Sequence, residues 1–308
     1  MNPARPFPKG LAYGCWRLAG SEGAGTPADA AARGRTAVHA ALDAGFTVFD
    51  LADIYGGGAC ERLFGEALRE RSGARDGISI VTKCGIRRPG TPNPGDPHRY
   101  DFSGGYLRES VDGSLRRMQV DSIDVLLLHR PDYLMDPAEV AGVFVQLHDA
   151  GKVRSFGVSN FRPSQLEALR RACPLPLVTH QIELSLAHLP AMEDGTLDQC
   201  LAEGIRPMAW SPLGRGVLGD GELAGRDAAD RARIEGIRVA LDAVAATHGS
   251  TRGVVALAWL LRHPSGIVPI VGTVNPTRIA EARKAESLRL GREDWYRLLA
   301  AARGTGLP

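Results

Sequence analysis

Short β-rich runs alternate with helical patterns along the whole chain, and this alternation is the feature that most limits its fold. Such alternation is typical of βα units, in which helices cover a parallel sheet. Eight runs occur: residues 11–16, 45–50, 78–83, 123–129, 153–159, 177–181, 205–210 and 267–271. They predict an α/β fold, a (β/α)8 TIM barrel that forms a single domain over residues 1–308. A doubly wound sheet is the alternative, but its typical order of about six strands would leave two runs over.

The segments between the runs carry helix signals. Thr26 is a candidate N-cap, with Pro27 in the first turn and Asp29 three residues further on. The predicted helices cover residues 26–45, 60–71, 107–118, 136–151, 163–174, 196–203, 227–247, 251–262, 276–286 and 293–303. Two long loops, 87–105 and 214–226, each follow a predicted strand. In a barrel both would border the mouth where the active site lies.

Composition excludes several classes of partner. The formal net charge is +2, from 37 basic and 35 acidic residues mixed along the 308-residue chain, which disfavours nucleic acid and membrane surfaces. Five scattered cysteines, none in a C-x-x-C pair, indicate a reducing compartment without disulfides or a metal site. Residues 1–9 contain no signal-peptide core, and no run reaches transmembrane length. We expect a cytoplasmic protein, monomeric or weakly self-associated, that acts on a small molecule.

Four polar residues, Asp50, Tyr55, Lys83 and His129, lie where apolar runs end and loops begin. Parallel α/β proteins place their sites along the carboxyl ends of the strands, so these positions suggest chemistry. Lysine occurs at only four positions in this arginine-rich chain. A lysine kept at the end of a β run therefore indicates a need for an ammonium group that a guanidinium would not meet.

Together the four side chains can deliver a proton. A tyrosine has an ordinary pKa of about 10, and a nearby ammonium lowers it, so Lys83 would make Tyr55 a usable general acid or base. Asp50 would keep Lys83 charged, and His129 would hydrogen-bond a carbonyl oxygen or relay the proton. Reduction of that carbonyl needs a hydride, which a nicotinamide cofactor provides. Taken singly, the same residues could be a structural ion pair, a turn aromatic and a core histidine.

Two loops offer a phosphate site. Ser211, Pro212, Leu213, Gly214, Arg215 and Gly216 follow the seventh strand. Gly272 and Thr273 follow the eighth, with Asn275 and Pro276 opening a helix that carries Arg278. TIM barrels often bind phosphate through these loops, and Arg278 would favour a cofactor with a 2′-phosphate, hence NADPH (NADP+) over NADH. Residues 214–219 match G-x-G-x-x-G, but no strand-turn-helix context surrounds them, so they predict no Rossmann site.

Further strand-end residues would hold the nicotinamide. Trp210 ends the seventh strand and could stack on the ring. Ser159, Asn160 and Gln181 end the fifth and sixth strands and could bind its carboxamide, although such residues often only cap backbone.

At this level of detail the chain resembles the aldo-keto reductase superfamily across nearly its whole length, with predicted bacterial oxidoreductases as the closest likeness. The motifs that carry the resemblance lie at residues 49–56, 81–83, 127–132, 152–161, 181–183 and 210–214. The resemblance implies a barrel, NADPH, and reduction of aldehydes or ketones. Tyr55 would be the acid, Lys83 and Asp50 its tuning pair, and His129 the group that orients the carbonyl. The candidate cofactor-binding set is Trp16, Ser159, Asn160, Gln181, Trp210, Ser211, Pro212, Leu213, Gly214, Arg215, Gly216, Gly272, Thr273 and Arg278.

Departures from the family pattern occur at Leu51, His180 and Gly272, where many members have a small residue, an asparagine and a cation. The chain also ends shortly after Arg303, which predicts a truncated third substrate loop and an open pocket. Two other functions remain alternatives: an NADPH-binding regulatory or redox-sensing module with little turnover, and a metal-dependent hydrolase. The hydrolase would use Asp50, Asp53, His129 and Asp132 but gives no role to Lys83 or Tyr55.

Overall fold

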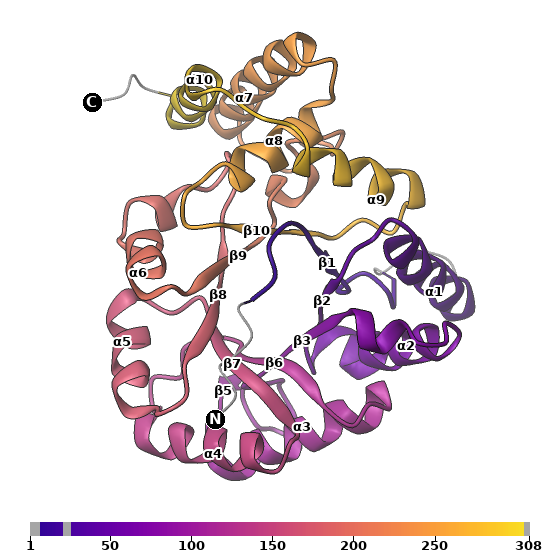
Figure 1. The fold of residues 1–308 in the computed structure, drawn as a ribbon, viewed down its shortest axis with the longest axis vertical. Helices are drawn as coiled ribbons and strands as arrows, with labels where there is room; N and C mark the ends of the chain where they lie inside the picture. Colours follow the sequence, from indigo (N-terminus) through magenta and orange to yellow (C-terminus); the bar gives the residue numbers. More distant parts are fainter. Residues whose placement is uncertain (1–6, 21–25, 305–308) are drawn as a thin grey trace.

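Eight parallel strands close into a barrel in the order β1-β10-β9-β8-β7-β6-β3-β2 within the described residues of the computed structural model, 7–20 and 26–304. Figure 1 shows the strands surrounded by helices. The predicted (β/α)8 barrel is therefore confirmed. The strands are β1 Ala12–Gly14, β2 Val48–Asp50, β3 Ser79–Cys84, β6 Ile123–Leu128, β7 Val153–Ser159, β8 Leu177–Glu183, β9 Arg206–Trp210 and β10 Val268–Val271.

The helices follow the strands as expected. They are α1 Pro27–Asp43, α2 Ala59–Arg69, α3 Gly104–Met118, α4 Pro137–Asp149, α5 Pro163–Ala172, α6 Thr196–Glu203, α7 Ala228–Thr247, α8 Arg252–Leu261, α9 Pro276–Ala282 and α10 Arg292–Arg303. Short 3-10 turns are η1 Tyr55–Gly58, η2 Ala74–Gly77, η3 Pro190–Met192, η4 Gly214–Gly216 and η5 Arg283–Glu286. Thr26 caps α1 by accepting from Asp29 N at 3.2 Å. The helix predicted over 276–286 is divided between α9 and η5.

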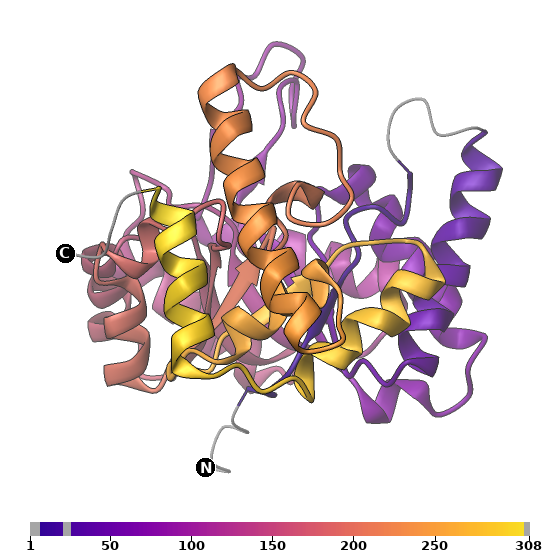
Figure 2. The ribbon, with the colours of Figure 1, turned by 90° about the horizontal axis from the view of Figure 1, so that it is seen from above.

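The long segment before α3 contains structure that the sequence did not indicate. β4 Ile86–Arg87 and β5 Arg99–Tyr100 pair as an antiparallel hairpin outside the barrel. Two-residue strands carry too few side chains to show a period. Figure 2 shows this segment and the one before α7 projecting from the same side of the barrel.

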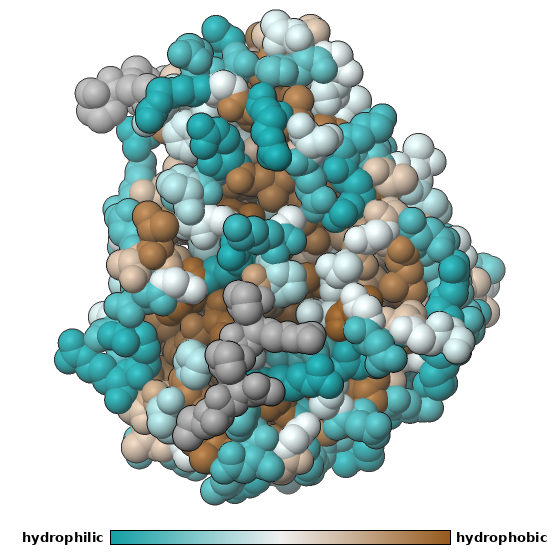
Figure 3. Space-filling model, in the orientation of Figure 1, coloured by the Kyte–Doolittle hydropathy of each residue, from teal (hydrophilic) through white to brown (hydrophobic). Residues whose placement is uncertain are grey.

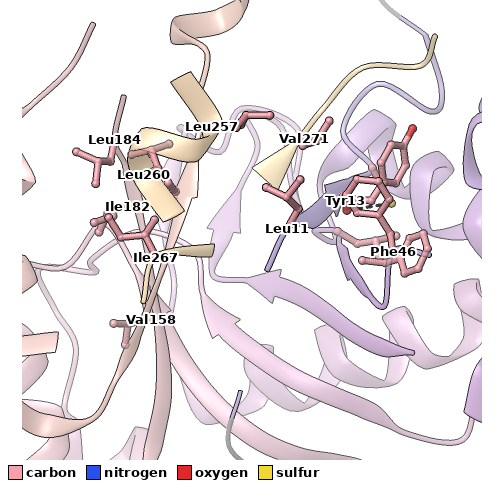
Figure 4. Packing of buried hydrophobic residues seen from close by; sticks show 14 of the residues in the cluster. Leu11, Tyr13, Phe46, Val158, Ile182, Leu184, Leu257, Leu260, Ile267 and Val271 are labelled. Atoms are coloured by element: carbon pink, nitrogen blue, oxygen red, sulfur yellow. Dashed lines mark hydrogen bonds between the residues drawn. The ribbon is translucent and has the colours of Figure 1, made fainter. Parts of the chain in front are cut away.

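The core has two layers. Apolar side chains fill the barrel interior, with Phe7 packed against them; they are Ala12, Val48, Val81, Val125, Leu127, Met208, Val268 and Ile270. A larger cluster lies between the sheet and the helices. Figure 4 shows part of it, with Tyr13 beside Phe46, their ring centroids 5.9 Å apart.

The surface viewed in Figure 3 mixes polar and apolar residues. Among the described residues, no helix combines the length and apolar character that a bilayer crossing requires.

Strands β2, β3 and β6 are neighbours in the barrel. Asp50 pairs with Val81 of β3, and Lys83 pairs with Leu127 of β6. The carboxyl ends of these three strands therefore meet at one edge, which carries Asp50, Lys83 and His129.

Candidate active site

A buried lysine organises the carboxyl edge of the barrel. The Lys83 side chain is fully buried, and its Nζ donates to Asp50 Oδ1 at 2.7 Å, to Leu51 O at 2.6 Å and to Tyr55 Oη at 3.2 Å. An ammonium has three N–H groups, and these contacts use all of them. The structure thus brings together three of the four residues that the sequence singled out.

The segment after β2 positions Tyr55 by backbone contacts. Leu51 N donates to Val81 O at 2.8 Å, and Asp53 N donates to Lys83 O at 3.0 Å, so the chain follows β3 beyond the strand end. The three glycines 56–58 then have φ values of 56°, 64° and 87°. This left-handed turn strains any residue with a Cβ, which explains the glycine run next to Tyr55.

His129 completes the group from β6. Its ring lies edge-on to the Tyr55 ring, with 5.9 Å between centroids. Burial lowers the pKa of His129 well below its ordinary value, and the positive charges of Lys83 and Arg130 act in the same direction. The imidazole is therefore neutral at pH 7, and its buried Nδ1 makes no hydrogen bond within the described residues. A neutral ring has one N–H to donate to a ligand.

Burial also decides the acidity of Tyr55. It raises the pKa of Tyr55 above the ordinary value, while the Lys83 ammonium opposes that rise and Asp50 supports it. Burial works to lower the pKa of Lys83, but Asp50 and Tyr55 outweigh it, so this pKa is raised. The sequence indicated that Lys83 would lower the pKa of Tyr55, but it did not indicate the opposite and larger effect of burial. Tyr55 therefore keeps its proton at neutral pH, as a proton donor must.

Gln181 belongs to the same hydrogen-bond network. Its Nε2 donates to Asp50 Oδ1 at 2.7 Å, so the oxygen that binds Lys83 accepts from two donors. The sequence proposed Gln181 as a carboxamide contact, and nothing in its spacing indicated Asp50, which lies 131 residues away.

Trp210 is fixed by Asn160. Trp210 Nε1 donates to Asn160 Oδ1 at 3.0 Å, and Asn160 Nδ2 donates to Ser159 Oγ at 2.7 Å and to His129 O at 3.3 Å. Asn160 adopts a left-handed φ of 59°, which asparagine tolerates better than most residues. The ends of β6, β7 and β9 are joined by these bonds.

The proposed phosphate loops also meet. Arg278 Nη2 lies 3.2 Å from Asp220 Oδ2, and this ion pair connects the first turn of α9 to the loop after β9. In the β9 loop, Gly214 N donates to Ser211 O at 2.8 Å and Gly216 N donates to Leu213 O at 2.9 Å, while Pro212 is buried and Arg215 exposed. These turns leave the cationic side chains at the surface, where an anion can reach them.

Strand β1 and the loop after it contribute residues that the sequence missed. Tyr13 Oη donates to Thr273 O at 3.0 Å, and Arg17 Nη1 donates to Gly272 O at 2.8 Å. A Cβ at Gly272 would come within 3.3 Å of Arg17 Nη1. Arg17 therefore occupies the space beside Gly272. Trp16, the neighbouring candidate, is 61% exposed.

The residues of the hydrolase alternative do not converge. Asp53 Oδ2 accepts from Tyr106 Oη at 3.2 Å and from Ser110 Oγ at 2.8 Å, both on α3. Asp132 accepts from the backbone of Phe102 and Leu134, each at 2.9 Å. Across residues 7–20 and 26–304 no group of three His, Cys, Asp or Glu side chains is placed to hold a metal. Asp53 and Asp132 therefore have structural contacts instead.

A closed βα barrel with a buried Asp–Lys–Tyr network at its carboxyl edge defines the class as barrel oxidoreductases. The model of the Aldo/keto reductase family matches residues 10–303, and the chain belongs to this family.

Relatives agree with this assignment. The chain is 45% identical to a 6-dehydroglucose reductase of Novosphingobium aromaticivorans over 304 residues, covering 97% of this chain and 93% of the relative. It is 43% identical to oxidoreductase YdhF of Escherichia coli, covering 87% and 86%.

Solved structures agree as well. The glycerol dehydrogenase of Gluconobacter oxydans superposes with a TM-score of 0.86 at 26% identity, covering 99% of this chain and 96% of the other. An aldo/keto reductase of Klebsiella pneumoniae, solved in complex with NADP and acetate, gives 0.73 at 26% identity, covering 94% and 89%.

Proposed function

We propose that this protein is an NADP(H)-dependent reductase that converts an aldehyde or ketone to an alcohol, with Tyr55 as general acid. The observation that carries the proposal is the 3.2 Å contact between Lys83 Nζ and Tyr55 Oη, made while the same ammonium binds Asp50. When bound, NADPH supplies the hydride, chemistry that no side chain provides.

The residues around the mouth fit such a cofactor. The indole of Trp210, oriented by its bond to Asn160, offers a flat surface for a nicotinamide. Arg17 follows β1, Arg215 follows β9 and Arg278 lies in the first turn of α9, so each of these segments offers guanidinium donors to a phosphate. The NADP complex of the Klebsiella relative supports the same choice of cofactor.

The proton step follows from the geometry of the quartet. His129, neutral because burial lowers its pKa, donates a hydrogen bond to the carbonyl oxygen. As that oxygen gains negative charge, the Tyr55 hydroxyl gives it a proton. The phenolate that remains faces the Lys83 ammonium, which Asp50 and Gln181 hold in place. Pre-placed charge of this kind stabilises the transition state without reorganisation.

A sugar aldehyde is the first substrate to test. Two relatives at 45% and 40% identity, from Novosphingobium aromaticivorans and Agrobacterium fabrum, are 6-dehydroglucose reductases. A glucose derivative oxidised at carbon 6 carries the aldehyde that the proposed chemistry needs.

The test is cofactor consumption over a panel of carbonyl compounds. NADPH and NADH oxidation would be followed at 340 nm with 6-dehydroglucose, simple aldehydes, ketones and quinones. We expect turnover of an aldehyde with saturation by NADPH at a lower concentration than by NADH. Saturation by NADH alone would overturn the cofactor, and NADPH binding without turnover over the panel would favour the regulatory module.

A further inference from the structure

Arg130 stands beside the proposed carbonyl site without a polar partner. It follows His129 directly at the end of β6 and is half-buried. Its guanidinium carbon lies 5.5 Å from the centroid of the Trp210 ring. Within the described residues, its side chain makes no hydrogen bond and no ion pair. Arg87, the last residue of β4, instead binds Asp101 at 2.9 Å.

The surroundings of Arg130 fix where it can act. The Trp210 ring next to the guanidinium donates a hydrogen bond to Asn160. The Asn160 side chain in turn donates one to the backbone carbonyl oxygen of His129. The positive charge of Arg130 also helps to lower the pKa of His129, so the guanidinium lies near the imidazole that would orient the carbonyl group. A guanidinium stacked on an aromatic face keeps the N–H groups at its edge free for a ligand.

The chemistry of the group limits that ligand. Guanidinium has five N–H donors, no acceptor and a permanent charge. Partial burial removes water from it, and this is unfavourable unless acceptor oxygens replace the water. We propose that Arg130 binds acceptor oxygens that the substrate carries on carbons beyond its reacting carbonyl, hydroxyl or carboxylate, and so selects oxygen-rich aldehydes. This inference rests on the proposed reductase function and names its substrate class.

Two matched pairs of substrates test this proposal. Propanal and D-glyceraldehyde share three carbons and an aldehyde, but only glyceraldehyde carries hydroxyls; butanal and succinic semialdehyde form the corresponding pair for a carboxylate. The variants are Arg130→Met, which removes the donors while keeping a long side chain, and Arg130→Lys, which keeps the charge without the fork. Arg171→Met is the control, because Arg171 is exposed on α5 and pairs with Glu167.

In Arg130→Met we expect the KM for at least one oxygenated aldehyde to rise at least tenfold, with kcat within twofold. The KM for propanal and butanal should change less than twofold, and the Kd of NADPH, measured by fluorescence quenching, should not change. If the carboxylate is the bound group, Arg130→Lys recovers most of the affinity for succinic semialdehyde. If hydroxyls are bound, Arg130→Lys behaves like Arg130→Met on glyceraldehyde. Either pattern supports the proposal.

Equal effects on oxygenated and plain aldehydes, weaker NADPH binding, or no effect at all would overturn the role of Arg130 while leaving the reductase function standing. Should the protein reduce neither aldehydes nor ketones, the proposed function fails separately. Calorimetric binding of glycerol and 1-propanol to the NADP-loaded protein then still measures whether Arg130 prefers hydroxyls. Stronger binding of glycerol that Arg130→Met abolishes supports the preference, and equal binding contradicts it.

Discussion

The Lys83 ammonium and the Tyr55 hydroxyl lie 3.2 Å apart in a region where Lys83 has no exposure to solvent. Burial favours the protonated phenol and the ammonium favours the phenolate, and the pKa of Tyr55 reflects both. Tyr55 therefore stays protonated until a substrate oxygen gains negative charge and accepts the proton. Most of the expected behaviour of variants follows from this arrangement.

Tyr55→Phe should lower kcat/KM for aldehyde reduction by about 10²–10⁴-fold, because it removes the proton donor while keeping the aromatic ring. Binding of NADPH, followed by fluorescence titration, should be retained. Tyr296→Phe is the control, since Tyr296 is partly exposed on α10. Normal turnover by Tyr55→Phe would contradict the proposed mechanism.

Lys83→Met should destabilise the fold by about 3–5 kcal/mol, because it leaves the Asp50 carboxylate buried with Gln181 as its remaining donor. Asp50→Asn should also be destabilising, since it leaves the ammonium unpaired. The double variant should lose less than the sum of the two single losses, as expected for groups in contact. Urea unfolding measures all three, and strict additivity would show that the pair is not coupled.

Asp53→Asn should stabilise the protein at high pH. Burial raises the pKa of Asp53 to about 6 from 3.8, although Ser110 and Tyr106 oppose the rise. A raised carboxyl pKa means that the folded state binds the proton more tightly than the unfolded chain does. Above pH 6 the buried Asp53 charge therefore lowers the free energy of unfolding, and this loss of stability disappears as the pH falls towards 4. The variant should gain up to about 3 kcal/mol at pH 8 and little at pH 4.

Urea unfolding at the two pH values measures that gain, with exposed Asp76→Asn as the control. The Asp53→Asn variant should also keep its reductase activity, because the Asp53 side chain hydrogen-bonds to residues of α3 and to no side chain of the quartet. A loss of turnover comparable to that of Tyr55→Phe would place Asp53 back in the site.

His180→Asn should make the protein more resistant to acid. Burial lowers the pKa of His180 to about 4 from 6.5. The unfolded chain therefore takes up a proton that the folded chain does not, and stability falls as the pH decreases from 6.5 towards 4. This loss is about 2–3 kcal/mol at pH 4.5.

Asparagine has no such titration and keeps an acceptor for Phe161 N, which donates to His180 Nε2 at 3.2 Å. The gap in unfolding free energy between pH 7.5 and pH 4.5 should therefore shrink in the variant. An unchanged gap would mean that His180 does not control acid stability.

Arg278→Met should weaken NADPH binding about tenfold while leaving NADH binding nearly unchanged, because only NADPH has the 2′-phosphate that a guanidinium binds. Arg297→Met is a close control, since Arg297 is 57% exposed against 58% for Arg278 and also pairs with an aspartate. Equal losses for both cofactors would assign Arg278 to another part of the site.

The sequence alone predicted the barrel, because the residue patterns of strands and helices are local and the chain repeats a strand followed by a helix eight times. It also indicated Asp50, Lys83 and His129, since a polar residue at the end of an apolar run is visible without any long-range contact. The β4–β5 hairpin could not be predicted in this way, because each of its strands has only two residues.

Only the tertiary structure decided which distant residues lie in contact and how far each side chain is buried from water. Gln181 reaches Asp50, Arg17 fills the space beside Gly272, and Arg130 lies over Trp210, all through contacts between distant parts of the chain. The acidity of Tyr55 follows the same division: the sequence named Lys83 as its partner, but the larger influence is burial. Burial depends on the packing of the whole barrel, and therefore no local pattern encodes it.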